Sequence, residues 1–378
     1  MKRPVIMLAT YIHSAFDTRI FVKEALTLGK SGFSVSVIVP HDTNEEKEGI
    51  LIVAVEQYTS SFKKLFISPL DVFSKALKQA KNSVFHIHDA QLLFIGFLLK
   101  LSGRTVIYDA HEDTLLQTQY QYWIPSLIRM PYARVYYFLE KLSGVFFDSV
   151  IVAEPVIEQY YPKKKTTLIR NFPVVESFKT PSPTTYGNRR NQLVYIGLIS
   201  EPRGASIMVR AFKKASDKIS IKFVMGGKFS PESLQKSIGL DEKIEYIGWL
   251  SHEQMIQTLF NSRVGIIIPE PNPRYKTNYP VKLFEYMAAG LPVIASKFGE
   301  AAKFVEECDG GILVDPQNEQ EVSEAIIKLF GSPDLAEQMG NRGRELIMTK
   351  YNWENESKKL TELYDRLNFS NGTKHNER

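Results

Sequence analysis

The sequence predicts an α/β protein built from two doubly wound domains in tandem, and three observations lead to this fold class. Short β-branched runs alternate with longer segments of helical period along nearly the whole chain, which is the order of parallel sheets covered by helices on both faces. The alternation stops between residues 172 and 192, a stretch rich in proline and poor in apolar residues, and then restarts. The length of 378 residues also exceeds the usual domain of about 100–200 residues.

The first predicted domain spans residues 1–175. Its strands are expected at Val5–Thr10, Ser34–Val39, Leu51–Val55, Val84–His88, Thr105–Asp109 and Ser149–Ala153. Its amphipathic helices include Phe21–Lys30, Pro69–Lys81, Ala90–Leu101 and Ser126–Leu142. In open sheets of this kind, ligands bind beyond the carboxyl ends of the strands, so polar residues that follow a strand are the candidates for a site.

The second predicted domain spans residues 176–350 and repeats the alternation. Its strands are expected at Leu193–Gly197, Ile221–Met225, Ile244–Ile247, Val264–Ile268, Pro292–Ala295 and Gly311–Val314. Its helices are expected at Gly204–Ala215, Pro231–Ile238, His252–Phe260, Pro280–Ala289, Glu300–Glu306, Glu319–Phe330 and Pro333–Met348. A last amphipathic helix, residues 351–368, is expected to pack back on the first domain, and residues 369–378 are expected to form a flexible tail.

The composition excludes several classes of protein. Apolar residues make up 44% and charged residues 24%, the balance of a soluble globular chain. A single cysteine, Cys308, excludes an internal disulfide and a cysteine-based zinc site, and it favours a reducing compartment. The net charge of +5 suits phosphorylated ligands or anionic lipid and does not argue for nucleic acid. We therefore expect a cytoplasmic protein and leave open a peripheral position on the inner face of the plasma membrane.

The densest group of functional candidates lies in residues 269–296, PEPNPRYKTNYPVKLFEYMAAGLPVIAS. Here a strand ends in a proline-rich loop, and Pro280 is placed early in the next helix. The free N–H groups of a helix start suit a phosphate, and Lys282 adds a cation in the first turn. Glu285 lies one turn later on the same side, where a carboxylate can accept hydrogen bonds from ribose hydroxyls. The alternative is a surface Lys–Glu pair on an ordinary helix.

This segment resembles the donor-site signature of glycosyltransferase family 4, whose members are retaining enzymes of the GT-B fold. Four further segments resemble the family in the same order: LTLGKSGFSVSVI, VFHIHDA, LVYIGLISEPRGASIMVRAF and GGILVDPQNEQEVSEAI. The resemblance covers nearly the whole chain. It implies two Rossmann-like domains facing a central cleft, a nucleotide-sugar donor on the second domain, an acceptor on the first, and no obligatory metal or other cofactor.

Three positions depart from the family pattern. Thr277 stands where the family has a glutamate that usually faces the donor sugar, and Leu198 stands where many members have a basic residue after the glycine matching Gly197. The loop after the first strand also lacks the usual glycine pair. Neutralisation of a diphosphate then rests on Arg203 and Lys282.

The resemblance implies further site residues after other strands. Arg203 is expected to hold the diphosphate bidentately, against the alternative of a solvated loop arginine. His111 is expected near the transferred sugar, where it contacts a hydroxyl or stabilises positive charge at the anomeric carbon. Gly299 is expected to offer a backbone N–H to the donor, against the alternative of a simple turn. His111, Arg203 and Lys282 are thus the predicted catalytic residues, and Arg203, Lys282, Glu285 and Gly299 are the predicted donor-binding residues.

Candidates for the acceptor side are Asp17 and Arg19 in the first loop and His88 at the end of a strand. For Asp17 and Arg19 the alternative is a structural ion pair. His86, two residues before His88, is expected to be buried, with His88 at the edge of the cleft. The histidines lack zinc spacing and the sequence has no Asp-x-Asp, so no metal site is predicted.

Basic and aromatic residues gather in two segments of the first domain. One segment, residues 120–147, holds Arg129, Arg134 and Lys141 among nine aromatic residues, and the other pairs Lys63 and Lys64 with two phenylalanines. Such surfaces can lie in an anionic membrane interface. The alternative is a buried helix whose aromatic residues belong to the core.

The resemblance implies that the protein is a retaining, hexosyl-type glycosyltransferase. It is expected to move a sugar from a nucleotide-diphosphate sugar, with UDP as the expected nucleotide, to a glycan or lipid-linked acceptor in bacterial polysaccharide synthesis. Two alternatives stay open: a nucleotide-sugar epimerase of the same fold, and a non-catalytic nucleotide-sugar-binding scaffold subunit. Thr277 and Leu198 favour the scaffold, and the joint presence of Arg203, Lys282 and Glu285 argues against it.

Overall fold

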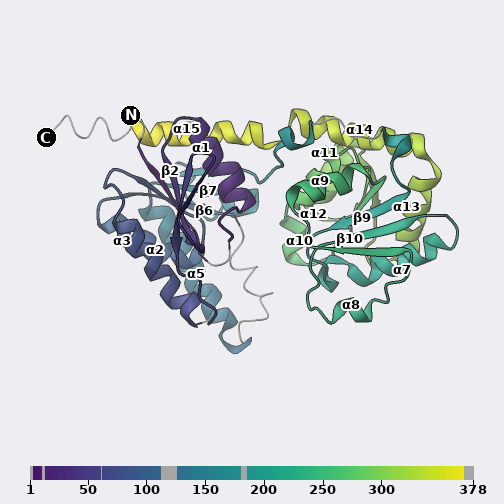
Figure 1. Ribbon diagram of the computed structural model, residues 1–378, viewed down its shortest axis with the longest axis horizontal. Coiled ribbons are helices and arrows are strands. Elements are labelled where there is room, and N and C mark those ends of the chain that lie inside the picture. Colours follow the sequence, from purple (N-terminus) through teal and green to yellow (C-terminus); the bar gives the residue numbers. More distant parts are fainter. Residues whose placement is uncertain (1–2, 11–12, 61, 112–125, 180–184, 370–378) are drawn as a thin grey trace. The chain divides into compact units, whose positions relative to one another are not determined.

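The computed structural model describes residues 3–10, 13–60, 62–111, 126–179 and 185–369. The chain divides into two compact units (Figure 1). Met1–Asn171 and Trp353–Arg378 form unit 1, and Phe172–Asn352 form unit 2. Each unit has a sheet of mostly parallel strands with helices on both faces, so the predicted pair of doubly wound α/β units is confirmed.

Unit 2 begins at Phe172, four residues before the predicted start at residue 176. The reason is packing. Phe172 is 2% exposed, and its ring lies 4.8 Å from that of Phe284 and 6.4 Å from that of Phe304, both in unit 2. Val175 and Phe178 are buried in the same core. The proline-rich stretch therefore begins as part of the second core instead of as a free linker.

In the described part of unit 1, eight strands form one sheet in the order β3-β4-β2-β1-β5-β6-β7-β8. The strands are β1 (Val5–Leu8), β2 (Val35–Pro40), β3 (Glu45–Lys47), β4 (Ile50–Val55), β5 (Val84–Ile87), β6 (Thr105–Ala110), β7 (Ser149–Val152) and β8 (Thr166–Leu168). Each neighbouring pair is parallel except β3 with β4. Because β1, β5 and β6 are adjacent and parallel, their carboxyl ends meet at one edge of the sheet.

Helices cover both faces of this sheet (Figure 1). Helices α2 (Ser68–Leu77), α3 (Leu93–Leu101) and α5 (Ser126–Phe146) lie next to one another on one face. The π-helical segment η1 (Thr18–Ala25), α1 (Leu26–Lys30) and α15 (Trp353–Phe369) lie on the other. Helix α15 packs on α1 and η1, and Trp353 Nε1 donates a hydrogen bond to Thr27 Oγ1 at 3.0 Å. The last helix thus belongs to unit 1. The remaining short helical segments are η2 (Lys63–Ile67), η3 (Ala90–Leu92) and α6 (Pro155–Glu158).

In the described part of unit 2, six parallel strands form a sheet in the order β11-β10-β9-β12-β13-β14. The strands are β9 (Gln192–Ile196), β10 (Lys222–Gly226), β11 (Ile244–Gly248), β12 (Val264–Ile267), β13 (Val293–Ser296) and β14 (Gly311–Val314). The helices are α7 (Ala205–Ser216), α8 (Leu234–Ser237), α9 (His252–Phe260), α10 (Pro273–Thr277), α11 (Val281–Ala288), α12 (Gly299–Cys308), α13 (Glu319–Gly331) and α14 (Pro333–Thr349). The 3-10 turns are η4 (Val175–Phe178), η5 (Tyr186–Asn188) and η6 (Glu201–Arg203).

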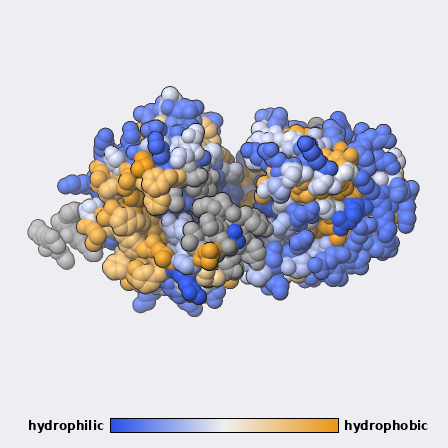
Figure 2. All heavy atoms as spheres, turned by 90° about the horizontal axis from the view of Figure 1, so that it is seen from below, coloured by the Kyte–Doolittle hydropathy of each residue, from blue (hydrophilic) through white to orange (hydrophobic). Residues whose placement is uncertain are grey.

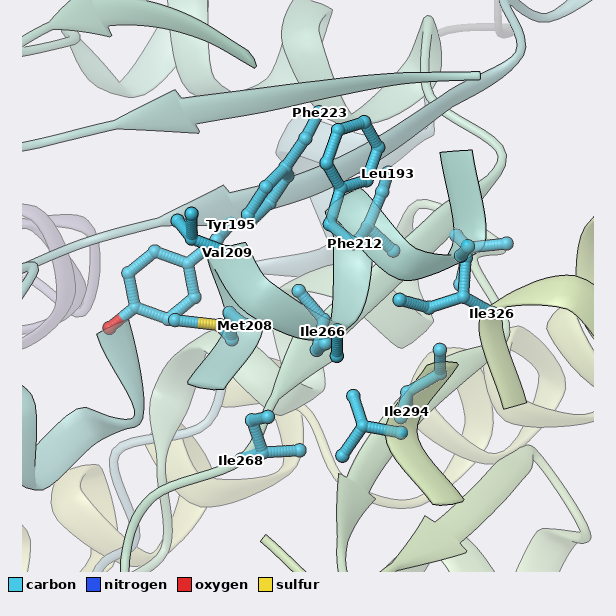
Figure 3. Packing of buried hydrophobic residues seen from close by; sticks show 14 of the residues in the cluster. Leu193, Tyr195, Met208, Val209, Phe212, Phe223, Ile266, Ile268, Ile294 and Ile326 are labelled. Atoms are coloured by element: carbon cyan, nitrogen blue, oxygen red, sulfur yellow. The ribbon is translucent and has the colours of Figure 1, made fainter. Parts of the chain in front are cut away.

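The core of unit 2 has a part on each face of the sheet. On one face, α7 and α13 pack Met208, Phe212 and Ile326 against strand residues such as Leu193 and Phe223 (Figure 3). On the other face, α9, α11, α12 and α14 cover the strands. Burial of this kind contributes about 25 cal/mol per Å² of apolar surface and supplies most of the driving force for folding. It fixes the strand ends, which carry the candidate site.

Several elements were missed or misplaced by the sequence pattern, and four of them have a clear physical reason. Strands β3 and β8 have three residues each and lie at the two edges of the sheet, where half-exposed polar sequences carry no clear alternation. Helix α10 is a single turn inside the predicted proline-rich loop, with Pro273 in its first turn and Asn272 as its cap. The predicted helix at residues 21–30 begins at Thr18, because Asp17 accepts hydrogen bonds from the backbone N–H groups of Arg19 and Ile20.

Candidate functional site

At the carboxyl end of β9 in unit 2, the side chain of Lys282 lies against the backbone of Gly197. Helix α11 is fixed to β9 because the backbone N–H of Ile196 donates to Tyr286 Oη at 2.7 Å. This contact places Lys282, in the first turn of α11, beside Gly197. Gly197 has φ 137°, and a Cβ at this position would collide with Lys282 Nζ. The glycine is therefore required for the ammonium group to reach the strand end.

The Lys282 ammonium is close to a second cation and to a phenol. Its Nζ donates to Tyr195 Oη at 3.2 Å and lies 4.6 Å from the centroid of the Tyr195 ring. Burial and the nearby charge of Arg203 lower the pKa of Lys282 to about 7, against the opposing effect of Glu285. An anion bound at this position would restore the charge on the amine. The arrangement therefore suits a phosphate.

Arg203 approaches the same point from the loop after β9. It ends the turn η6, and Gly204 follows with φ 82° at the start of α7. A Cβ on Gly204 would collide with the backbone oxygen of Ile268, so glycine lets this turn lie against the end of β12. Burial lowers the pKa of Arg203, but the phenols of Tyr195 and Tyr275 outweigh burial and raise it. The guanidinium is half-buried and stays charged.

The structure thus brings Arg203, Lys282 and Glu285 together at one strand end, as the sequence predicted. Glu285 lies one helical turn after Lys282 and is close enough to raise its pKa. The donor contact expected of the Gly299 N–H stays a prediction, and the structure shows a packing role for this residue at the start of α12. A Cβ at Gly299, which has φ 73°, would stand 2.7 Å from the backbone oxygen of Lys276 in α10. We therefore assign Gly299 the close packing of α10 on α12, which holds Tyr275 beside Arg203.

Thr277, which replaces the expected glutamate, is the last residue of α10. Its Oγ1 donates to the backbone oxygen of Arg274 at 3.3 Å, and its side chain is half-buried. The hydroxyl therefore caps its own helical turn. Threonine is uncharged, so Thr277 does not supply the carboxylate that the expected glutamate would have added to the site.

In unit 1, the carboxyl ends of β1, β5 and β6 carry a cluster of charged side chains. Asp109 lies at its centre and is 1% exposed. Arg19 Nε donates to Asp109 Oδ2 at 2.6 Å and Arg19 Nη2 donates to Asp109 Oδ1 at 2.9 Å, a bidentate pair. Burial raises the pKa of Asp109, but the Arg19 charge outweighs it and holds this pKa well below its usual range. Arg19 and Asp109 are therefore both charged and form a buried ion pair.

His111, the predicted catalytic histidine, follows β6 at the rim of this cluster. Its side chain is 22% exposed, and its Nδ1 lies 3.7 Å from Asp109 Oδ2. Its ring lies 5.6 Å from the ring of His13, centroid to centroid, at an angle of 67°. His111 can therefore present a ring nitrogen outward while Asp109 lies behind it.

Two of the acceptor-side predictions need correction. His88 is 1% exposed instead of lying at an edge, because β5 lies in the middle of the sheet and Glu24 and Asp109 pack over its end. Arg19 is 4% exposed and adopts the ion-pair alternative with Asp109, and Glu24 Oε1 also lies 3.2 Å from Arg19 Nε. His86 is buried as expected, and its Nδ1 lies 2.9 Å from Tyr364 Oη of α15.

Asp17 is half-buried in a second part of the same edge, beside a histidine that the sequence reading did not select. His13 Nδ1 lies 3.2 Å from Asp17 Oδ2, and His13 Nε2 lies 3.2 Å from Asp89 Oδ1. Burial lowers the pKa of His13, but the hydrogen bonds and charges of the two carboxylates outweigh it and raise the pKa to about 10. His13 is therefore an imidazolium with both N–H groups engaged.

A metal ion could be considered where Glu24, His86, His88 and Asp109 converge, since their ligand atoms lie within 4.8 Å of one another. The guanidinium of Arg19 already supplies a positive charge there, because it contacts both carboxylates. Burial and the neighbouring Asp109 raise the pKa of Glu24 well above its usual range, which favours its neutral, protonated form. These two facts account for the charge balance of the cluster without a metal.

A depression in the described part of unit 2 lies at the opposite edge of the sheet. It is lined by the amino ends of β9 and β10 and by surface groups such as Lys218, Lys222 and Glu242. Ligands of parallel sheets bind at the carboxyl edge. This depression is therefore not the candidate site.

Sequence reasoning missed Tyr195, Tyr275 and His13. Tyr195 had a usable signal, since side chains two residues apart on a strand point to the same face, which puts Tyr195 on the same face as the strand-ending Gly197. Tyr275 lies in the single helical turn α10 and His13 lies in an irregular segment, and neither stretch has a periodicity that predicts the direction of a side chain. Their roles come from tertiary contacts with Arg203 and with Asp17 and Asp89.

Residues 179–346 match the family described as glycosyl transferases group 1. An uncharacterised glycosyltransferase of Methanocaldococcus jannaschii is 23% identical over 179 residues, which are 46% of this chain and 44% of that protein. The N-acetyl-alpha-D-glucosaminyl L-malate synthase of Bacillus anthracis is 21% identical over 215 residues, which are 56% of this chain and 50% of that protein. The matched stretches thus span about half the length of these relatives. The predicted resemblance to glycosyltransferases is confirmed at this level, and the finer assignment to family 4 stays a prediction.

The whole chain is also similar to solved glycosyltransferase structures. The structure of Anabaena HepE in complex with UDP-glucose has a TM-score of 0.73 at 14% identity and covers 96% of this chain and 99% of its own. At this identity the likeness concerns the fold. The predicted fold class, GT-B with two Rossmann-like domains, is confirmed.

Proposed function

We propose that this protein is a retaining glycosyltransferase that moves a sugar from a UDP-sugar to a hydroxyl of a glycan or lipid-linked acceptor in bacterial polysaccharide synthesis. The observation that carries the proposal is the pair of cations, Lys282 and Arg203, at the end of β9, with Glu285 one turn away. Two cations at a parallel strand end match a diphosphate, and the carboxylate matches a ribose. The Anabaena relative was solved with UDP-glucose, which supports uridine as the base.

In this proposal the cations of unit 2 stabilise the diphosphate as it leaves the sugar. Charge grows on the leaving phosphate during the reaction, so Arg203 and Lys282 bind the transition state more tightly than the ground state. His111 of unit 1 would contact the transferred sugar and stabilise positive charge at its anomeric carbon. The leaving phosphate would take the acceptor proton on the same face of the sugar, which keeps the anomeric configuration. No metal takes part, because Arg203 and Lys282 supply the positive charge.

Calorimetry with UDP tests the donor site. Lys282→Ala and Glu285→Ala should each weaken UDP binding, because each removes a charged contact worth about 1.5–3 kcal/mol. Lys303→Ala is the matched control, since Lys303 forms a surface pair with Glu300 on α12 at 2.6 Å. A thermal-shift panel of UDP-, GDP-, ADP- and TDP-sugars would identify the base, because a ligand of the folded state raises the melting temperature. Wild-type affinity for every nucleotide in both variants would refute the assignment.

Two other functions use the same donor contacts and are separated by their products. An epimerase would convert a UDP-sugar into its epimer without any acceptor. A scaffold subunit, which Thr277 and Leu198 favour, would bind the donor and turn nothing over. Formation of a glycoside whose anomeric configuration equals that of the donor is the result that we expect.

We further propose that unit 1 rests on an anionic membrane while it meets its acceptor. Twelve apolar side chains on and beside η2, α2, α3 and α5 are between 41% and 90% exposed, and Figure 2 shows apolar residues gathered on this face of unit 1. They are Phe62, Phe66, Leu70, Leu77, Phe94, Leu101, Leu127, Met130, Val135, Phe138, Val145 and Phe146. We call this set the α2–α3–α5 face. So large an exposed apolar area marks an interaction surface.

Charge on the α2–α3–α5 face favours lipid over a neutral partner. Lys63, Arg134 and Lys141 are exposed among these apolar residues. Glu140, the acid of this part of α5, is buried and accepts a hydrogen bond from Tyr108 Oη at 2.8 Å. Among the described helices, none combines the length and apolar composition that a membrane crossing requires. A basic apolar face without such a helix fits a peripheral position at anionic headgroups.

Co-sedimentation with vesicles tests the membrane proposal. The wild type should bind anionic vesicles at low salt, and joint replacement of Lys63, Lys64, Arg129 and Arg134 by Glu should abolish binding, since each basic residue contributes about 1 kcal/mol. The matched control replaces four lysines of unit 2, Lys214, Lys218, Lys222 and Lys236, by Glu. Equal binding to neutral and anionic vesicles, or none to either, would contradict the proposal. The segment at residues 120–125, which holds Tyr120, Tyr122 and Trp123, lies outside the described residues.

A further inference from the structure

The carboxyl group of Glu24, in η1, is completely buried at the carboxyl edge of the unit 1 sheet. Its exposed fraction is 0%, and among the described residues neither of its oxygens has a hydrogen-bond partner. Its Oε1 lies 3.2 Å from Arg19 Nε, but this N–H donates to Asp109 Oδ2 at 2.6 Å instead. A buried carboxylate needs hydrogen-bond donors to offset the water that it loses. An ionised Glu24 is therefore disfavoured at this position.

A proton on Glu24 satisfies the contact between the two neighbouring carboxyl groups. Ligand oxygens of Glu24 and Asp109 lie within 4.8 Å of each other. Two ionised carboxylates repel each other and have only acceptors, whereas a protonated carboxyl group can donate its O–H to a carboxylate. Burial and the Asp109 charge raise the pKa of Glu24, against the opposing charge of Arg19. Because the Arg19 charge outweighs burial and lowers the pKa of Asp109, Glu24 carries the proton and Asp109 carries the charge.

The other groups that face Glu24 leave this proton in place. His86 Nδ1 and His88 Nδ1 each lie 3.7 Å from Glu24 Oε2, and burial lowers the pKa of both histidines, which favours their neutral forms. Tyr364 of α15 is a buried phenol, and burial raises its pKa well above the usual value. The charge of Asp17 raises the pKa of Glu24 further. None of these four neighbours is a cation that would draw the proton away.

The proton on Glu24 decides which carboxylate the Arg19 guanidinium serves. With Glu24 neutral, Arg19 is the bidentate partner of Asp109 alone. This pair holds Asp109 Oδ2 at 3.7 Å from His111 Nδ1, a buried nitrogen that has no hydrogen-bond partner in the described part of the chain. Hydrogen bonds of this kind are often long in a free enzyme and tighten when substrate binds. Without the proton, two carboxylates would compete for one guanidinium, and Asp109 would lose its fixed place behind His111.

We propose that Glu24 is a positioning residue for sugar transfer, whose carboxyl O–H holds Asp109 behind His111 so that the other ring nitrogen of His111 meets the sugar. This inference rests on the proposed function. It assigns the orientation of His111 to a proton that the fold buries. Glu24 itself does not contact the reacting atoms.

Two variants of Glu24 separate a shared proton from a packing role. The substrate is the nucleotide sugar that the thermal-shift panel selects, with water as the acceptor. Glu24→Gln keeps the shape of the side chain and an N–H donor toward Asp109, so kcat should stay within about threefold of the wild-type value. Glu24→Ala removes the donor, and kcat should fall about tenfold or more with UDP affinity unchanged. An equal loss of kcat in both variants, or no loss in Glu24→Ala, would overturn the inference.

Glu356→Gln is the matched control. Glu356 is also a buried glutamate of unit 1, but its carboxylate accepts a hydrogen bond from the Arg170 backbone N–H at 2.9 Å and pairs with Lys359 at 2.8 Å. Its side chain thus has the donors that Glu24 lacks. We expect kcat and its pH dependence in Glu356→Gln to equal those of the wild type.

The pH dependence of kcat is a readout that packing alone would not move. Because the pKa of Glu24 is raised in the folded protein, its proton is present at neutral pH and is lost as the pH rises through that value. The kcat of the wild type should therefore fall at alkaline pH, and Glu24→Gln, which has no such proton, should lack this fall. Saturating donor keeps Lys282 charged and removes its titration from the profile. The same fall in both proteins, or a fall in neither, would overturn the inference.

Infrared spectroscopy detects the proton without any turnover. The C=O stretch of a protonated carboxyl group is separate from the carboxylate bands and shifts in D₂O. The wild type and Glu356→Gln should show this band at neutral pH, and Glu24→Gln should lack it. Absence of the band in the wild type would overturn the inference. If the band is present and Glu24→Ala turns over normally, the inference fails and the proposed function stands. If the wild type binds none of the nucleotide sugars in the panel, both fail.

Discussion

Each unit has charged residues at the carboxyl edge of its own sheet, but these charges are paired with opposite charges in unit 1, whereas two cations lie close together in unit 2. In unit 1, Arg19 and Asp109 are buried and neutralise each other, and His13 lies between two carboxylates. In unit 2, burial and the nearby charge of Arg203 lower the pKa of Lys282, and Glu285 is the acid that opposes this effect. Charges that pair within the fold stabilise it, whereas cations held together against their repulsion are available to an anionic ligand.

The largest expected effect breaks the pairing in unit 1. Asp109→Ala leaves the Arg19 guanidinium buried without its bidentate partner, which should lower the free energy of unfolding by about 3–5 kcal/mol. Urea unfolding followed by circular dichroism measures this. Lys282→Ala is the comparison from unit 2, and it should leave the free energy of unfolding unchanged or raised, because it removes a desolvated cation next to Arg203. A stability loss in Lys282→Ala as large as that in Asp109→Ala would contradict the contrast between the units.

A smaller effect concerns His111, a half-buried histidine at the rim of the unit 1 cluster. His111→Ala should reduce turnover about a hundredfold, as for a lost transition-state contact, while nucleotide affinity stays near the wild-type value. Steady-state transfer rates beside calorimetry with free nucleotide measure both quantities. His252→Ala, at an exposed histidine of α9, is the control. Normal turnover in His111→Ala would remove His111 from the site.

The smallest expected effect is that of EDTA. If the cations of unit 2 neutralise the diphosphate, transfer activity should survive chelation unchanged, and added manganese or magnesium should not raise it. The same assay on Arg203→Ala sharpens the comparison, because that variant should lose both binding and turnover. Loss of wild-type activity in EDTA with recovery on adding either metal would refute the metal-free account.

The architecture could be predicted from the sequence because the spacing of apolar residues shows directly which side chains are buried in strands and helices. It also found Lys282, Glu285 and Arg203, since each follows a strand at a fixed offset from a glycine or proline. It was wrong on His88, because a residue at a predicted strand end looks the same whether that end is open or covered by Glu24 and Asp109. It could not choose between a core helix and an exposed one at residues 126–146, since aromatic content is the same in both. In the structure the Phe138 side chain is 61% exposed, which shows that this side of the helix faces solvent and not the core.

The central claim is that Lys282 is only partly protonated in the free protein and becomes fully charged when a phosphate binds beside it. Proton uptake on binding tests this claim most directly. With a pKa of about 7 in the free protein, most Lys282 side chains are neutral at pH 8. A bound diphosphate raises this pKa, so binding must draw in a proton at pH 8 and much less at pH 6, where the amine is already charged. Titrating UDP at pH 8 in buffers of different ionisation enthalpy measures the uptake. We predict about one proton for the wild type and none for Lys282→Ala. UDP binding without proton uptake in the wild type at pH 8 would contradict the account.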